Sequence, residues 1–550
     1  MIRNEIKKLI KQAVKTHWDV DLELDEIKID YPPEDFGDYA TNVAMKMAKI
    51  AKSNPMEAAE DIAEHLRKSD LFEKIDVAKP GFINFYLKNE SLQKQISSIL
   101  NKKENFGSLD IGKNKKTQVE FISANPTGPL TLGNGRGGFY GDVLANILTK
   151  AGYEVEREYY INDIGEQIRA LGRSVLQYGE TVDGKLKAVY AGNYIGFIKT
   201  YIEKGEFFSL SEINNQKDKN NPQKIGKLSA DYIMWEIIKP TIEEKMQIKF
   251  DEYFFESELH PEKVDEIINY LKEKKLAYEK EDALWFKSTQ FGDDKDRVLV
   301  KADGEKTYLA SDIAYLKNKF ERGFKKLVYI WGADHHGYVG RLKAAAKALE
   351  YNPDNIEIII MQLVRLMSDG KEVKMSKRAG TYVTIDELID EVGLDVARFF
   401  FLMYSPDAHM NFDLDLAKEH SQKNPVYYAQ YAHARMCSIF AKSDANYTNE
   451  HANDANVLKL LNQEIELRLI KQLIKFPEII EDSARDYQVH CLPHYALDLV
   501  RQFHKFYEEC RVINEKNPAL TEARLDLIRA VQIVLRNSLK LMGIEALEKM

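Results

Sequence analysis

The sequence predicts an α/β protein: a parallel nucleotide-binding sheet interrupted by an inserted domain, with a small N-terminal α/β domain before it and a C-terminal helical bundle after it. Three observations support this fold class. The 550 residues exceed what one hydrophobic core normally organises, so several domains are expected. A strand ends at Pro126 and Gly128, and a Gly-rich turn then opens a helix. Strands and helices alternate again over residues 312–366, as they do in a parallel sheet.

Composition and charge exclude several classes of protein. Hydrophobic residues make up 44% of the chain and charged residues 30%, and no apolar run approaches bilayer-spanning length, so we expect a cytoplasmic protein without a membrane role. Cys437, Cys491 and Cys510 include no C-x-x-C pair, which argues against a disulfide framework and a thiolate zinc site. The net charge of -9 argues against a generally basic surface, but local patches can still bind nucleic acid.

The first domain is expected to span residues 1–105. It begins with MIRNEIKKLIKQAVKTHW, whose apolar residues recur at helical spacing and which lacks the compact apolar block of a signal peptide. A second amphipathic stretch leads to GFINFYL, a short alternating strand. A polar linker then separates this domain from the next.

The nucleotide-binding domain is expected over residues 115–415, with an insertion at about 170–300. The insertion is helical and charged in character, with an exposed loop at NNQKDKNNPQK and β-like segments at ALWF and DRVLVKADG. The alternation of the parallel sheet returns from DIAYLKNKFERG to IEIIIMQLVRL. Residues 416–550 contain helix after helix and predict an all-α domain.

Two segments together indicate a triphosphate site: SANPTGPLTLGNGRGG, residues 123–138, and KMSK, Lys374 to Lys377. Small residues let backbone amides approach a phosphate, and the N-terminus of the following helix favours anions. The two lysines would bring positive charge to phosphates that separate during attack at the α-phosphate. Alone, a Gly-rich turn is common in α/β folds and a Lys-rich tetrapeptide is usually a solvated face; their order, spacing and fold context favour the functional interpretation.

At these residues the sequence resembles the class I aminoacyl-tRNA synthetases, and within them the arginyl-tRNA synthetases. The resemblance covers nearly the whole chain. It is carried by SANPTGPL, EYYINDIGEQI, WGADHHGY, KMSKRAG, SPDAHMNFDLD, NPVYYAQYAHAR and MGIEALEKM, in the order of that family. At the N-terminus, EDFGDYATNVAM and KPGFINFYL resemble the small domain that contacts the elbow of the tRNA.

The resemblance implies a Rossmann-like catalytic domain, a tRNA-elbow-binding N-terminal domain and an anticodon-binding C-terminal bundle. The substrates would be L-arginine, ATP with Mg²⁺ and an arginine-specific tRNA, with no tightly bound cofactor, and the enzyme would be a monomer. Arginine would be activated to arginyl-adenylate and transferred to the 3′ end of the tRNA. In this family tRNA must usually be bound before activation.

The chain departs from the family at its first signature, which normally is His-x-Gly-His. Here the corresponding residues are Thr131, Leu132, Gly133 and Asn134. A hydroxyl and an amide can donate hydrogen bonds to ATP phosphates but carry no charge, and the loss would cost about 2 to 4 kcal/mol at the transition state if nothing compensated. Arg136, one turn into the helix, is a candidate for compensation; a solvated or carboxylate-paired role is an equal alternative.

The resemblance also assigns individual residues. Catalytic roles fall to Thr131, Asn134, Lys374 and Lys377. ATP contacts fall to Pro126, Gly128, Leu132, Gly133, Gly135, Arg136, Gly332, Asp334, Met375 and Ser376. The amino acid would be held by Glu120, Ser123, Ala124, Asn125, Tyr308, Asp312 and His335.

Within the last set, Glu120 and Asn125 would bind the amino-acid backbone groups, and Tyr308 and Asp312 would bind the guanidinium. Tyr308 and Asp312 lie one helical turn apart and share a face. The plain alternative is that Tyr308 is a core residue and Asp312 a charge near a helix start. Adjacent histidines, His335 and His336, would point to opposite faces of a strand and make a poor chelate, so no zinc is expected.

Both ends of the chain are expected to bind RNA. Phe82 and Asn84 lie where the family reads a base of the tRNA D-loop. In the C-terminal helices aromatic and basic residues are interleaved, as anticodon recognition requires, although helical spacing also makes some of them core residues. The candidates are Tyr427, Tyr428, Tyr431, His433 and Arg435.

Three alternatives stay open. A class I synthetase for another amino acid would lack the arginine-type SANPTGP and NPVYYAQYAHAR segments. A non-catalytic tRNA-binding paralogue is favoured by Thr131 and Asn134 and opposed by KMSK and Glu120. A nucleotidylyltransferase on the same sheet would not need the long helical C-terminal domain.

Overall fold

The chain forms two compact units. The computed structural model describes residues 1–179, 181–182, 185–186, 189–190, 192–204, 220–373, 384–443 and 455–550. Unit 1 combines both ends of the chain, Met1–Leu109, Pro425–Asp486 and Cys491–Met550. Unit 2 contains Asp110–Asn424 together with the short segment Tyr487–His490.

The N-terminal part of unit 1 is a three-stranded antiparallel sheet, order β1-β3-β2, packed against helices. The opening segment forms the predicted helix, which buries Ile6, Ile10 and Val14 at helical spacing. GFINFYL contains the predicted strand. The elements are α1 (Ile2–Trp18), β1 (Tyr39–Thr41), α2 (Val43–Ala51), α3 (Pro55–Leu66), β2 (Phe72–Ala78), β3 (Phe82–Leu87) and α4 (Asn89–Lys102).

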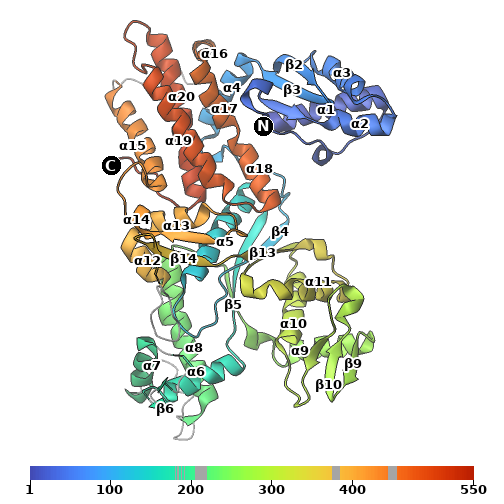
Figure 1. The fold of residues 1–550 in the computed structure, drawn as a ribbon, viewed down its shortest axis with the longest axis vertical. Coiled ribbons are helices and arrows are strands. Elements are labelled where there is room, and N and C mark those ends of the chain that lie inside the picture. The colour runs from blue at the N-terminus through green and yellow to red at the C-terminus, as the bar shows by residue number, and fades with distance from the viewer. Residues whose placement is uncertain are drawn as a thin grey trace. The chain divides into compact units, whose positions relative to one another are not determined.

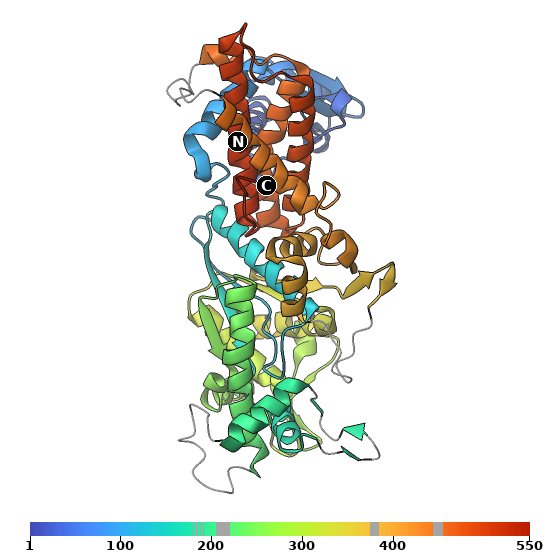
Figure 2. The same cartoon turned by 90° about the vertical axis from the view of Figure 1, so that its left-hand side faces the viewer.

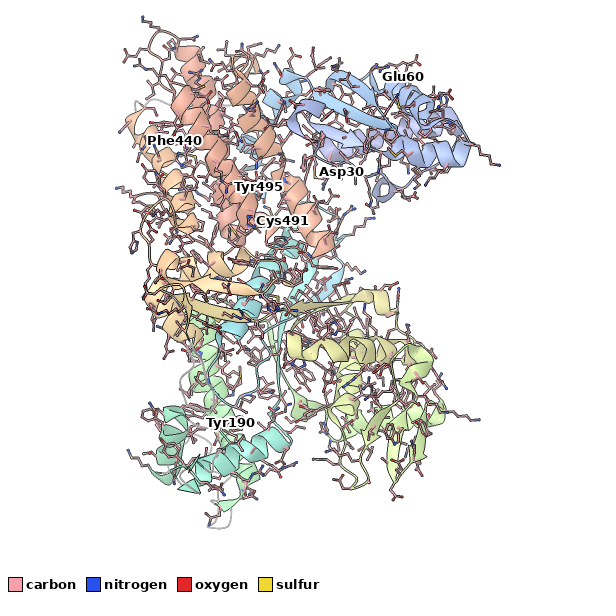
Figure 3. All side chains as sticks on the ribbon, in the orientation of Figure 1. Asp30, Glu60, Tyr190, Phe440, Cys491 and Tyr495 are labelled. Atoms are coloured by element: carbon pink, nitrogen blue, oxygen red, sulfur yellow. The ribbon has the colours of Figure 1, made fainter. Side chains whose placement is uncertain are left out.

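The C-terminal part of unit 1 is all helical in its described residues, as the sequence predicts. Figures 1 and 2 show its long helices running alongside one another. Tyr495, labelled in Figure 3, is buried in this bundle and donates a hydrogen bond to the carbonyl of Gln472. The helices are α15 (Pro425–Lys442), α16 (Ala455–Leu458), α17 (Glu464–Ile474), α18 (Phe476–Asp486), α19 (Cys491–Glu509) and α20 (Pro518–Leu541).

Buried polar contacts join the two parts of unit 1. The Arg3 guanidinium donates to the carboxylates of Glu481 and Asp482 on α18. Glu478 accepts from the Arg3 backbone and from the hydroxyls of Tyr31 and Tyr39. Because the buried Arg3 cation is paired with carboxylates of α18, these contacts tie the N-terminal part to the helices within one unit.

Unit 2 is built on a parallel sheet of five strands in the order β13-β12-β4-β5-β8. The chain leaves β4 toward β5 on one side and returns to β12 on the other. The strand order therefore reverses between β4 and β12, and ligands of open parallel sheets bind at the carboxyl ends of strands at such a point. The strands are β4 (Lys116–Glu120), β5 (Glu154–Ile161), β8 (Glu252–Phe255), β12 (Lys326–Gly332) and β13 (Ile356–Met361).

The predicted strand–turn–helix opening is present: β4 is followed by α5 (Leu132–Lys150). The alternation predicted further along the chain is also present, as α10 (Tyr308–Glu321), β12, α11 (Val339–Ala348) and β13. IEIIIMQLVRL, however, forms β13 and then β14 (Val364–Ser368) in a second small sheet with β15 (Lys371–Glu372) and β16 (Met410–Asp413). The remaining helices of this region are α12 (Ile385–Val392), α13 (Leu394–Leu402) and α14 (Leu414–Ala417).

The stretch expected to be one insertion is divided by a strand of the main sheet. β8 lies within it and pairs in parallel with β5. Before β8 in the sequence come the helices α6 (Glu166–Leu176), α7 (Asn193–Lys204) and α8 (Pro222–Tyr232). After β8 come α9 (Glu262–Glu273) and an antiparallel sheet of β9 (Ala277–Lys280), β10 (Ala283–Phe286) and β11 (Arg297–Val300). β10 coincides with the predicted β-like segment ALWF, and β11 lies within DRVLVKADG.

The loop expected at NNQKDKNNPQK needs a correction at its end. Asn221 accepts a hydrogen bond from the backbone of Gln223 and caps α8, so Pro222–Lys224 are the first turn of a helix. Residues 214–219 of that loop lie outside the described part. Among the described helices, none is both long and apolar enough to cross a membrane.

Candidate active site

A cavity of 310 Å³ opens at the carboxyl end of the central sheet, where the strand order reverses. Residues of β4, β5, β12 and α10 line it, together with the 3₁₀ helices η8 (Glu256–Leu259) and η10 (Ala333–Tyr338). Of the residues expected to hold the amino acid, all except Ala124 line this cavity: Glu120, Ser123, Asn125, Tyr308, Asp312 and His335. The carbonyl of Ala124 instead accepts a hydrogen bond from the hydroxyl of Tyr159.

The loop after β4 has an unusual backbone. Ile122 and Ser123 have positive φ angles of 64° and 39°, a backbone conformation that residues other than glycine rarely adopt. The Ser123 hydroxyl accepts a hydrogen bond from the backbone of Tyr160 on β5, which ties the loop to the neighbouring strand. The turn brings Ser123 and Asn125 to the same cavity as Glu120 at the end of β4.

Helix α10 contributes a stripe of residues at helical spacing: Tyr308, Asp312, Tyr315 and Lys319. Tyr308 is 46% exposed at the cavity, so the alternative that it is a core residue is wrong. Asp312 also lines the cavity, in the second turn of the helix. Tyr315 is buried and forms part of the cavity wall, and Lys319 is buried beneath it.

The cavity is strongly acidic because three carboxylates line it: Glu120, Asp312 and Glu256. Burial, with the nearby charges of Glu256 and Glu120, raises the pKa of Asp312 to about 7. Burial also raises the pKa of Glu120, although the ammonium group of Lys319 lowers it in part. Arg341 is the arginine that lines the cavity.

Glu256 was missed by the sequence reasoning. Its side chain is buried, and Oε2 has no hydrogen-bond partner among the described residues. A buried carboxylate oxygen without a donor is costly, so this atom fits a ligand that brings its own donors. The sequence signal for Glu256 is the segment DEYFFE, in which an acidic residue follows a short strand, and it indicates the cavity only when β8 is known to pair with β5 in the main sheet.

At the altered signature, Thr131 and Asn134 bond to each other. Thr131 is the N-cap of α5; its hydroxyl and its backbone N–H both donate to Asn134 Oδ1, at 2.8 and 2.9 Å. The backbone N–H of Asn134 completes a capping box on the Thr131 hydroxyl. The Asn134 amide nitrogen has no partner among the described residues, so it is the group left to donate to an anion.

Arg136 does not face an anion site. It is 1% exposed, and its guanidinium donates to the carbonyls of Gln362, Ser405 and Ala408 at 2.7, 2.8 and 2.9 Å. The expectation that it compensates for the missing histidines is therefore corrected, as is the alternative of a solvated or carboxylate-paired side chain. A buried guanidinium bound to three carbonyls has a structural role, tying α5 to the end of β13 and the turn before β16.

The KMSK segment lies outside the described residues, so Lys374, Met375, Ser376 and Lys377 are not placed. The first part of the glycine-rich segment, with Pro126 and Gly128, crosses from β4 to α5. Leu132, Gly133 and Gly135 form the first turn of that helix. A side chain at Gly135 would collide with Ile385, which explains the glycine there by packing.

The expectation that WGADHH forms a strand throughout is wrong, because the chain leaves the strand conformation after β12. The strand ends at Gly332, and Asp334, His335 and His336 are exposed residues of η10. A Cβ atom on Gly332 would lie 2.7 Å from Asp334 Oδ1, which is the end of an exposed side chain that can move aside, so packing does not require a glycine at this position. His335 lies between the rings of Trp331 and Tyr338, with ring centroids 5.9 and 5.8 Å away.

The residues expected to bind RNA differ in exposure. Phe82 is 38% exposed on β3, whereas Asn84, two residues along the same strand face, is buried. On α15, Tyr427, Tyr431 and Arg435 lie one turn apart and are half-buried; Arg435 donates to the Tyr431 hydroxyl at 2.9 Å.

His433 is not available for stacking, contrary to expectation. It is buried, and its Nδ1–H donates to the carbonyl of Leu547 at 2.8 Å. Tyr428 stacks on His504 within the bundle, with ring centroids 5.1 Å apart.

Comparisons with known proteins agree with this geometry. The chain matches the family models "Arginyl tRNA synthetase N terminal domain" over residues 4–87, "tRNA synthetases class I (R), catalytic domain" over 95–403 and "DALR anticodon binding domain" over 429–550. It is 46% identical over 524 residues to the arginine–tRNA ligase of Carboxydothermus hydrogenoformans, covering 94% of this chain and 92% of that protein.

Two further relatives span the whole chain. The arginine–tRNA ligase of Bacillus subtilis is 43% identical over 555 residues, covering 100% of this chain and 99% of that protein. The solved structure of the Thermus thermophilus arginyl-tRNA synthetase shares the fold, with a TM-score of 0.79 at 22% identity and full coverage of both chains. With its acidic cavity at the switch point of a parallel sheet and three matching domains in order, this chain belongs to the arginyl-tRNA synthetase family.

Proposed function

We propose that this chain activates L-arginine with ATP and then esterifies the arginine to the 3′ end of an arginine-specific tRNA. The observation that carries the proposal is the acidic cavity at the carboxyl ends of β4 and β12, which combines Glu120, Glu256 and Asp312. Arginine carries two cationic groups, an α-ammonium and a guanidinium, and both need carboxylates when they leave water.

The guanidinium would be bound by Asp312, Glu256 and the hydroxyl of Tyr308. Its planar fork of N–H donors suits two carboxylates better than a single ammonium group does. Glu256 Oε2, which lacks a partner among the described residues, would receive one of these donors. Glu120 and Asn125, after β4, would bind the α-ammonium and the carbonyl group. Ser123 and His335 also line the cavity, and Ala124 lies between Ser123 and Asn125 in the loop after β4.

ATP would enter as its Mg²⁺ complex and lie against the first turn of α5. The helix N-terminus and the Asn134 amide would donate to the phosphates, with the Thr131 hydroxyl fixing that amide. Gly332 and Asp334 would contact the adenosine, and Lys374 and Lys377 would stabilise the departing pyrophosphate. The remaining contacts would come from Pro126, Gly128, Leu132, Gly133, Gly135, Met375 and Ser376.

The reaction needs no covalent enzyme intermediate. The arginine carboxylate attacks the α-phosphate in line, forming arginyl-adenylate and releasing pyrophosphate. A terminal ribose hydroxyl of the tRNA then attacks the acyl carbon and AMP leaves. The protein contributes positioning and electrostatic stabilisation.

The tRNA would be held by both parts of unit 1. Phe82 is an exposed aromatic residue on the N-terminal sheet and can stack on a base, with Asn84 as its neighbour on that face. Tyr427, Tyr431 and Arg435 form a face of α15 that can meet anticodon bases. We further propose a monomeric, cytoplasmic enzyme with domains at residues 1–105, 115–415 and 416–550.

The proposal is tested by ATP/pyrophosphate exchange with the purified protein, using the twenty amino acids one at a time, each with and without total tRNA. We expect exchange with arginine alone and only when tRNA is present. A folded protein that binds tRNA but exchanges with no amino acid would be the non-catalytic paralogue, which the Thr131–Asn134 pair favours. Exchange with a different amino acid would reject the assigned pocket.

A further inference from the structure

We infer that Lys319 is a positioning residue of the amino-acid pocket: it holds the Glu120 carboxylate in place and ionised, ready for the α-ammonium group of the substrate. The inference rests on the proposed function, because it takes Glu120 as the α-ammonium acceptor. Lys319 lies beneath the cavity and does not line it, so it would act through Glu120 without touching substrate.

Lys319 is fully enclosed by the protein. Its side chain is 0% exposed, which is rare for lysine unless the ammonium group is paired. The Nζ atom donates to Glu120 Oε2 and lies 3.8 Å from Glu158 Oε1. It also lies 4.1 Å from the ring centroid of Tyr315 and 4.2 Å from that of Tyr329, whose faces attract a cation.

The charge of Lys319 is directed mainly at Glu120. Glu158 is the cross-strand neighbour of Glu120 and already has other donors, the Tyr315 hydroxyl and the Arg322 guanidinium. Glu120 receives Lys319 as its cation. A role confined to neutralising Glu158 would not need a second buried cation.

The position of Lys319 on α10 links both ends of the substrate pocket. Asp312 and Lys319 are seven residues apart on one helix face, which is about 10 Å along the helix axis. The same helix therefore presents Asp312 to the guanidinium at one end of the pocket. At the other end it places Lys319 against Glu120, the carboxylate proposed to bind the α-ammonium group.

The environment of Glu120 favours its protonated form, and the Lys319 ammonium group acts in the opposite direction. Burial and the adjacent Glu158 raise the pKa of Glu120, whereas the Lys319 ammonium lowers it. Asp312 responds to the same ammonium group, but less than to burial and to Glu256 and Glu120. The titratable and charged groups around Glu120, from every element packed on it, are Asp312, Tyr315 and Lys319 of α10, Glu158 and Tyr160 of β5, Tyr329 of β12 and Glu256 of η8.

The test is the variant Lys319→Met, which keeps the length of the side chain and removes its charge. In tRNA-dependent exchange at pH 7 we expect the arginine KM to rise about tenfold or more, because the buried Glu120 carboxylate loses the partner that holds it in place and favours its ionised form. The KM values for ATP and tRNA should stay within about twofold, because neither substrate meets Glu120. The ratio of the variant's arginine KM to that of the wild type should fall as the pH rises to 9, because Glu120 then ionises without help.

Two controls use the same helix. Lys319→Arg keeps the charge and should keep the wild-type pH profile. Lys317→Met removes a half-buried lysine that pairs with Glu266 and Glu321 away from the pocket, and should leave all three KM values unchanged. Should Lys319→Met not fold, Lys319→Gln, which retains a hydrogen-bond donor without the charge, replaces it in the same assay.

A substrate analogue separates the two ends of the pocket. 5-Guanidinopentanoic acid is arginine without its α-amino group, so its inhibition constant should change less than about twofold in Lys319→Met, because it has no ammonium group for Glu120. An equal loss for arginine and the analogue would overturn the inference, and so would a KM ratio that does not vary with pH. Failure of the proposed function would instead appear as a wild-type enzyme without arginine-dependent exchange.

Discussion

At the scale of single residues, the cavity contains more negative charge than its own cations neutralise. Glu120 has Lys319, but Glu256 Oε2 has no donor among the described residues, and the pKa of Asp312 is raised. These carboxylates are costly without a ligand and become favourable when a ligand with two cationic groups binds. The resemblance identified Glu120, Tyr308 and Asp312, whereas Glu256 required the folded chain.

The raised pKa of Asp312 predicts a pH dependence of arginine affinity. Asp312 must be ionised to bind the guanidinium, and with a pKa of about 7 in the free protein it becomes protonated below neutral pH. We therefore expect arginine affinity to fall roughly five- to tenfold between pH 7.5 and 6. Calorimetry in two buffers of different ionisation enthalpy should show proton release on binding at pH 7. A pH-independent affinity would contradict the assignment.

Asp312→Asn should weaken arginine binding by roughly a hundredfold, because a buried hydrogen-bonded charge pair loses one partner. It should leave the KM for ATP nearly unchanged. Glu273→Gln, at an exposed position on α9, serves as the matched control. Equal changes for both substrates would indicate a folding defect and would count against a specific guanidinium contact.

Glu256→Gln should separate stability from binding. In the free protein the neutral amide relieves a buried, incompletely bonded carboxylate, so the melting temperature should rise by about 2 to 4 °C. Arginine affinity should fall at least about tenfold, because one charge-assisted hydrogen bond is lost. Scanning calorimetry with and without arginine measures both effects. A lower melting temperature in the free protein would show that Glu256 is already stabilised by its surroundings.

At the scale of elements, the start of α5 is where this chain departs from its family. Thr131 and Asn134 together form a capping box, so the two substitutions act as a pair. The pair satisfies backbone donors and leaves one amide for an anion, but it provides no charge. Arg136 does not supply that charge, because it is bound to three carbonyls.

Thr131→Ala should lower the rate of exchange without changing tRNA affinity. The loss of the cap removes about 1 kcal/mol of helix stability and frees the Asn134 side chain to rotate away from the phosphates. Thr131→Ser keeps the hydroxyl and is the control. Filter binding of tRNA and exchange kinetics on both variants measure the two quantities. Equal exchange rates in wild type and Thr131→Ala would reject the role of this residue.

At the scale of the whole molecule, unit 1 is made from the two ends of the sequence. Helix α1 and helix α18 of the C-terminal bundle share a network in which Arg3 donates to Glu478, Glu481 and Asp482. The two regions expected to bind the tRNA elbow and the anticodon therefore belong to one compact body. A rigid connection between them would fix the spacing of the two proposed RNA contacts.

Arg3→Ala should weaken this connection. The substitution leaves buried carboxylates without their cation, which costs about 3 to 5 kcal/mol in comparable cases. We expect a lower unfolding temperature and faster proteolysis between residues 103 and 110. The affinity of unit 2 for arginine in the absence of tRNA should stay at the wild-type value. Arg67→Ala, which removes an exposed pair with Glu60, is the control and should unfold like the wild type. Unchanged unfolding of Arg3→Ala would show that the network does not hold unit 1 together.

The sequence by itself determined the features that depend on neighbours along the chain. Periodicity predicted α1, α10 and the alternation around β12, and the glycine-rich segment predicted the turn before α5, because these patterns record local burial and local backbone geometry. The family resemblance supplied the pocket residues after β4 and on α10, which line one cavity in the structure.

Only the tertiary structure decided the features that depend on distant partners. In the sequence, β8 has the character of the insertion around it, and only its pairing with β5 places it in the main sheet. That pairing brings Glu256, the residue after β8, to the cavity. Arg136 and Lys319 look like ordinary surface cations, and their burial follows from carbonyls and carboxylates that lie far away in sequence. Contacts between residues far apart in sequence determine whether a charged side chain is buried, and a single sequence does not show which residues make those contacts.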